Sequence, residues 1–112
     1  MLISFKNKKL EKELCDEKAL KRHWGHEQAK LIARRLTELA AAENLEILRK
    51  LPQVKAHELL GNRAGQISLD IKYPYRLLIT PDHEDTPRKE DGGLDWQKIT
   101  KIKVSGLEDT HG

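Results

Sequence analysis

A histidine and an arginine lie six residues apart on a glycine-bearing segment that precedes a predicted strand. The segment reads His57-Glu58-Leu59-Leu60-Gly61-Asn62-Arg63-Ala64-Gly65-Gln66. Its two glycines let the backbone turn sharply. An imidazole exchanges protons near neutral pH, and a guanidinium binds anions through a planar fork of donors. From these residues alone, a turn that carries two surface ions is an equally good interpretation.

Basic side chains are frequent in the C-terminal half, where strand patterns also occur. The net charge of the chain is only +3, because 18 acidic residues offset 21 basic ones, so the total is weak evidence for nucleic-acid binding. The distribution favours a basic face on a sheet, and the alternative is a scatter of charges over a solvated surface. The residues concerned are Arg63, Lys72, Arg76, Lys98, Lys101 and Lys103.

The elements that must position these residues begin with helices. Residues 2–5 form a short apolar stretch that predicts an edge strand, and Asn7 is a suitable N-cap for the helix that follows. Trp24-Gly25 is expected to end this helical segment. Apolar residues recur at three- and four-residue spacing over residues 26–43, which predicts an amphipathic helix. Asn44 then caps a short turn that ends before Pro52.

A sheet is expected after the helices. Residues 66–72 alternate between apolar and polar, and Tyr73-Pro74 connects them to a second strand over residues 75–80, so the pair predicts a β-hairpin. In the second strand, Leu77 and Ile79 share one face while Arg76 points to the other. Residues 81–94 predict a long loop, and a last strand is expected over residues 98–105. The order predicts a single α+β domain over residues 1–112, with two to three helices packed on one face of a small, mostly antiparallel sheet.

Composition favours a soluble cytoplasmic protein. Hydrophobic residues make up 38% and charged residues 35% of the chain, which suits one compact core with an ionic surface. The N-terminal residues predict neither a signal peptide nor a membrane span. The single cysteine, Cys15, has no partner for an internal disulfide. His23 and His26 lack the further ligands that zinc normally needs, so no metal or other cofactor is expected.

Three motifs follow one another in the C-terminal half: His57-x-Leu59-x-Gly61-Asn62-Arg63-x-Gly65, then Tyr75-Arg76, then Asp109-x-His111. Their combination resembles the HigB-like (plasmid maintenance killer protein) branch of the RelE/ParE superfamily of toxins, from type II toxin–antitoxin systems. The family pattern is approximately H-x-L-x-G-[DN]-R-x-G, then W-R, then D-Y-H. Chain length and the order of the N-terminal elements also agree with the family.

The resemblance implies a ribosome-dependent mRNA endonuclease that needs no metal. A ribose 2′-hydroxyl attacks the adjacent phosphate, which requires a base, an acid for the leaving oxygen and positive charge for the phosphorane. Arg76 would stabilise the phosphate, His57 and His111 would act as base or acid, and Asp109 would orient His111 or share the proton transfer. The predicted RNA-binding residues are Arg63, Lys72, Lys101 and Lys103. The implied partners are a cognate antitoxin protein, the ribosome and mRNA, in a homodimer or in a heterotetramer with the antitoxin.

The chain departs from the family pattern at three positions. Leu60 replaces a common lysine, Thr110 replaces a tyrosine, and Tyr75 replaces a tryptophan. The first two changes remove groups that could carry protons or stabilise charge. Two alternatives therefore stay open: a superfamily toxin that acts on DNA gyrase without cutting RNA, and a degenerate toxin that acts only as a co-repressor bound to its antitoxin.

Overall fold

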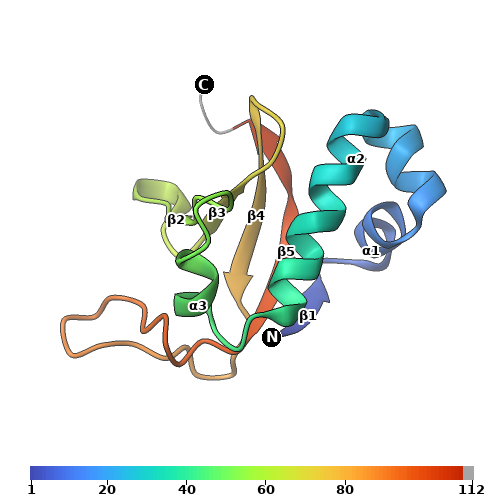
Figure 1. Cartoon of the computed structure of the whole chain (residues 1–112). Helices are drawn as coiled ribbons and strands as arrows, with labels where there is room; N and C mark the ends of the chain where they lie inside the picture. The colour runs from blue at the N-terminus through green and yellow to red at the C-terminus, as the bar shows by residue number, and fades with distance from the viewer. Residues whose placement is uncertain (110–112) are drawn as a thin grey trace.

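The computed structural model describes residues 1–109, and these form an α+β fold in which three helices pack with a five-stranded mixed sheet (Figure 1). The predicted fold class and the N-terminal strand are confirmed. In chain order the elements are β1 (Leu2–Phe5), α1 (Lys8–Cys15), α2 (Glu17–Ala41), α3 (Leu45–Arg49), β2 (His57–Glu58), the 3₁₀ turn η1 (Gly61–Arg63), β3 (Ile67–Asp70), β4 (Tyr75–Pro81) and β5 (Lys101–Asp109).

Short polar side chains start the helices, as predicted. The Asn7 side chain accepts a hydrogen bond from the Leu10 amide at 2.8 Å, and the Asn44 side chain accepts one from the Ile47 amide at 2.9 Å. Each bond satisfies an amide that has no partner within its helix. Gly25, with φ 79° and ψ 166°, interrupts α2 where the sequence predicted a helix end. The helix therefore has two parts that diverge at Gly25 (Figure 1).

The sheet has the order β1-β5-β4-β3-β2, and β1 is parallel to β5 while the other neighbours are antiparallel. The predicted hairpin is confirmed as β3 and β4, and Asp70 lies opposite Arg76. The last strand was predicted over residues 98–105, but β5 covers Lys101–Asp109. The shift has a physical reason: Ile99 is fully buried in the core before the strand starts, and Glu108 and Asp109 continue the pairing with β4.

One face of the sheet carries the core. Its fully buried side chains pack with helical residues of α2 and α3, in particular Ile32, Leu39, Leu45 and Leu48. The sheet contributes Ile67, Leu69, Leu77, Ile79, Ile102 and Val104. Side chains alternate along a strand, so the residues between these lie on the opposite side, which we call the outer face. Leu78 is on the outer face and is only 1% exposed, although it lies outside the main core cluster.

The segment between β4 and β5 was predicted as a long loop. Its tip is closed by the pairing of Arg88 with Leu94 and by a hydrogen bond from the Lys89 amide to the Gly93 carbonyl. Leu94 and Trp96 are then buried in the core. The Arg49 guanidinium of α3 stacks over the Trp96 ring at 4.3 Å, which holds this segment against the helix.

Candidate functional site

Three charged residues form a row across the outer face of the sheet. Register places Asp70 of β3, Arg76 of β4 and Glu108 of β5 side by side. The Arg76 Nη1 atom lies 2.8 Å from Asp70 Oδ1, and both side chains are only about a quarter exposed. A partly buried ion pair of this kind fixes the direction of the guanidinium more firmly than an exposed pair does.

Asp70 is itself held from the helical side of the molecule. Its amide donates to the Val54 carbonyl at 2.7 Å, and its carbonyl accepts a hydrogen bond from the Arg35 Nε atom at 2.6 Å. Arg35 is 6% exposed and also donates to the Gln53 carbonyl at 2.9 Å. The backbone of Asp70 is therefore fixed by two neighbouring segments, which places its carboxylate beside Arg76.

Glu108 binds a second arginine. The Arg63 guanidinium donates to its two carboxylate oxygens at 3.0 and 3.2 Å, although the residues are 45 positions apart. These hydrogen bonds lower the pKa of Glu108, and attraction to Arg63 and Lys6 lowers it further against the opposing effect of desolvation. The same pairing raises the pKa of Arg63. The turn η1 thus brings Arg63 over β5, next to the row that contains Arg76.

Two lysines complete this group of charges. The Lys55 Nζ atom lies 4.0 Å from Asp70 Oδ2, and Lys6 is close enough to Glu108 to lower its pKa. The group therefore holds four cations and two carboxylates, so its balance of charges is positive. We call it the arginine cluster, and its members are Lys6, Lys55, Arg63, Asp70, Arg76 and Glu108.

A second basic region lies at the other end of β5. Lys103 is opposite Ser4 of β1, and its Nζ atom is 3.7 Å from Asp82. The Ser4 hydroxyl donates to the Asp82 carboxylate at 2.7 Å, and this bond, followed by attraction to Lys103, lowers the pKa of Asp82 despite some desolvation. Lys101, opposite Leu2, is exposed on the same face. Five residues of strand, about 16 Å, separate Lys103 from Glu108.

The predicted residue His57 lies near the cluster. It is exposed, is opposite Ser68 and therefore belongs to the outer face. Register puts it two strands and two residues from Arg76, which corresponds to about 12 Å between the Cα atoms. His57 and Arg76 therefore lie on the same face of the sheet, with β3 between their strands. His57 also lines a groove of about 740 Å³ together with Arg49 and Trp96.

Other predicted residues lie elsewhere. The Lys72 Nζ atom pairs with Glu27 of α2 at 2.9 Å, and its amide donates to the Gln28 side chain at 2.8 Å, so Lys72 is turned toward the helix. Asp109 is opposite Tyr75, whose ring contacts Trp24 of α2 at a centroid distance of 5.8 Å. Asp109 is therefore one position beyond the row of Arg76, and Glu108 is the carboxylate within that row. His111 lies outside the described residues.

Sequence patterns did not single out Lys6, Lys55, Asp70 or Glu108. The alternation of apolar and polar residues along β3 indicated that Asp70 lies on the outer face. Its pairing with Arg76, and that of Glu108 with Arg63, depend on strand register and could not be predicted in this way. No group of three His, Cys, Asp or Glu side chains that could hold a metal ion occurs among residues 1–109. No helix in that range is long and apolar enough to cross a membrane.

Comparisons with known proteins add no assignment: no protein-family model matches the chain, and a search of curated proteins finds no match either.

Proposed function

We propose that this chain is the toxin of a type II toxin–antitoxin pair, of the HigB-like branch of the RelE/ParE superfamily, and that it cleaves mRNA on the ribosome. The observation that carries the proposal is the position of Arg76, which lies in the arginine cluster on the outer face and is oriented by Asp70. Arg76 follows Tyr75 in the second element of the family-like pattern. The α+β fold with its N-terminal strand agrees with that family, but fold alone does not determine function.

In the proposed reaction the ribose 2′-oxygen attacks the adjacent phosphorus while the bond to the 5′-oxygen breaks. A base removes the proton of the 2′-hydroxyl, and an acid gives a proton to the leaving oxygen. His57 and His111 are assigned to these two steps, with Asp109 two residues before His111 in the sequence. Arg76 stabilises the charge on the phosphorane, where a fixed guanidinium is more effective than a mobile one.

The basic groups of the outer face would hold the rest of the RNA. Arg63 contributes beside Arg76, and Lys101 and Lys103 contribute at the far end of β5. A single-stranded RNA that lies along β5 would therefore meet positive charge at both ends of it. The proposal places the protein in the cytoplasm, with the ribosome and mRNA as targets and an antitoxin as inhibitor.

A translating cell-free reaction tests this function. The purified chain is added, and new mRNA 5′ ends are mapped by primer extension. Wild type should cut within translated codons, and Arg76→Ala should lower the cleavage rate by a factor of about 10²–10³. Lys72→Ala is the matched control, because the structure pairs Lys72 with Glu27 away from the cluster, and it should cut nearly as fast as wild type. Intact mRNA with the wild-type protein would rule the proposal out.

Leu60 favours a second candidate. It is 83% exposed at the position where relatives commonly carry a lysine, so the loop lacks one cation. A toxin of the same superfamily that acts on DNA gyrase would inhibit supercoiling while leaving mRNA intact. If neither activity appears, growth is unaffected and operator binding needs the antitoxin complex, a degenerate toxin acting as co-repressor is the remaining interpretation.

A further inference from the structure

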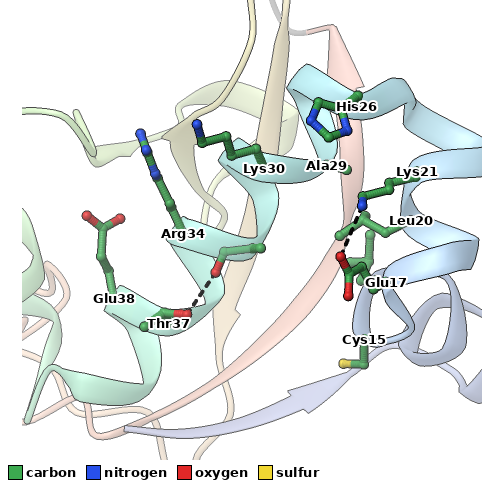
Figure 2. A pocket seen from close by; sticks show the side chains of 12 residues that line it. Cys15, Glu17, Leu20, Lys21, His26, Ala29, Lys30, Arg34, Thr37 and Glu38 are labelled. Carbon is green, nitrogen blue, oxygen red and sulfur yellow. Dashed lines mark hydrogen bonds and ion pairs between the residues drawn. The ribbon is translucent and has the colours of Figure 1, made fainter.

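A groove of about 720 Å³ separates the two arms of the helical layer. One wall is the second part of α2, from His26 to Glu38, and the other is formed by the end of α1 and the first part of α2 (Figure 2). The groove exists because α2 changes direction at Gly25, whose φ of 79° lies outside the helical range. The wall from residue 26 to residue 38 is about 18 Å long, since a helix rises 1.5 Å per residue.

The floor of the groove is apolar. Leu14, Leu20 and Ala29 are buried beneath it, and Ala33 is exposed within it. Small side chains on this wall leave room for another backbone to approach α2 closely. The length and the apolar floor suit about three turns of a helix, whose diameter with side chains is about 10–12 Å.

The rim has an uncompensated positive charge. His26, Lys30 and Arg34 follow one another at intervals of four residues, so they form one row along α2 (Figure 2). Among residues 1–109, Lys30 and Arg34 take part in none of the ion pairs. The rim carboxylates are already paired, because Glu17 binds Lys21 at 3.0 Å and Glu38 binds Arg35 at 2.8 Å.

From this combination we infer that the groove binds an acidic amphipathic helix of a partner protein. The apolar stripe of that helix would cover Leu20, Ala29 and Ala33, and its flanking carboxylates would pair with Lys30 and Arg34. A second copy of this chain fits less well, because a symmetric contact would bring two cationic rims together. Nucleic acid also fits less well, since an apolar floor offers nothing to a phosphate backbone. The proposal does not rest on the function of the outer face, with which the groove shares no residue.

Selection from a displayed peptide library tests the inference on the full chain. The library contains helices of about 14 residues, three to four turns, with a variable apolar stripe and flanking positions randomised among Glu, Gln and Lys. We expect enrichment of acidic flanks. The selected peptides should bind Lys30→Glu/Arg34→Glu at least about tenfold more weakly than wild type, with a smaller difference at high salt. Ala33→Trp, which fills the groove without changing charge, should also weaken binding.

The matched control is Lys18→Glu/Arg22→Glu, which changes the charge equally on α2 but outside the groove, and it should bind like wild type. Circular dichroism confirms that each variant is folded. Flanks without charge preference, or equal binding by the groove variants, would overturn the inference. Two other results with Lys30→Glu/Arg34→Glu would also overturn it. If the variant lost a self-association that wild type shows in sedimentation, the groove would be assigned to a second copy of the chain. If it lost the binding of a labelled oligouridine, the groove would be assigned to RNA.

Discussion

Replacing Arg35 by methionine should destabilise the protein strongly, although Arg35 is a charged residue on a helix. The Arg35 side chain is 6% exposed and connects three segments. Its Nε atom donates to the Asp70 carbonyl at 2.6 Å, one Nη atom donates to the Gln53 carbonyl at 2.9 Å, and the other pairs with Glu38 at 2.8 Å. Methionine fills much of the same volume but donates no hydrogen bond.

The loss can be estimated from the groups left behind. Glu38 keeps a hydrogen bond from the Gln53 side chain at 2.7 Å, so its carboxylate still has a hydrogen-bond partner. The carbonyls of Asp70 and Gln53 lose their arginine donor; both bonds are partly buried, and an acceptor left unsatisfied costs about 1–3 kcal/mol. The free energy of unfolding should fall by about 4 kcal/mol, a large part of the 5–15 kcal/mol typical of a domain.

Urea denaturation followed by circular dichroism measures this loss. With a slope of about 2 kcal/mol per molar urea, the midpoint should fall by about 2 M. Arg34→Met is the matched control, because Arg34 is the exposed neighbour on the same helix and takes part in no ion pair among residues 1–109. Its change in the free energy of unfolding should stay within about 0.5 kcal/mol. If Arg35→Met lowered the free energy of unfolding by less than about 1 kcal/mol, these hydrogen bonds would not be a main source of stability.

Two further predictions concern a carboxylate and a glycine. Binding to Arg63 lowers the pKa of Glu108 in the folded state, so this stabilisation is present above the ordinary glutamate pKa of about 4.3 and is lost as pH falls through the lowered value. Glu108→Gln should therefore show a smaller loss of stability on acidification than wild type in urea titrations at successive pH values, and an unchanged slope would contradict the pairing. Gly25→Ala should cost about 1–3 kcal/mol, because φ 79° and ψ 166° strain any residue with a Cβ atom, while no atom within 4 Å would obstruct that Cβ. Thermal unfolding should show a melting temperature lower by about 4–12 °C, and an unchanged value would refute the strain.

The helices and the central hairpin were accessible from the sequence because their signals are local. Asn7 and Asn44 cap helices through bonds to amides three residues away, and Gly25 marks a break through its own backbone angles. Alternation in β3 and β4 follows from the two-residue period of a strand. The course of β5 was harder to predict, because pairing with β4 extends this strand to Asp109.

By itself, the sequence determined the α+β class, the helix caps, the break in α2 and the outward position of Arg76. The tertiary structure decided which charges meet: Asp70 with Arg76, Arg63 with Glu108, and Lys72 with Glu27 rather than with the outer face. It also created the groove between the helical arms. Periodicity reports which face of its own element a residue occupies, whereas its partner on another element depends on register and packing between segments far apart in the chain.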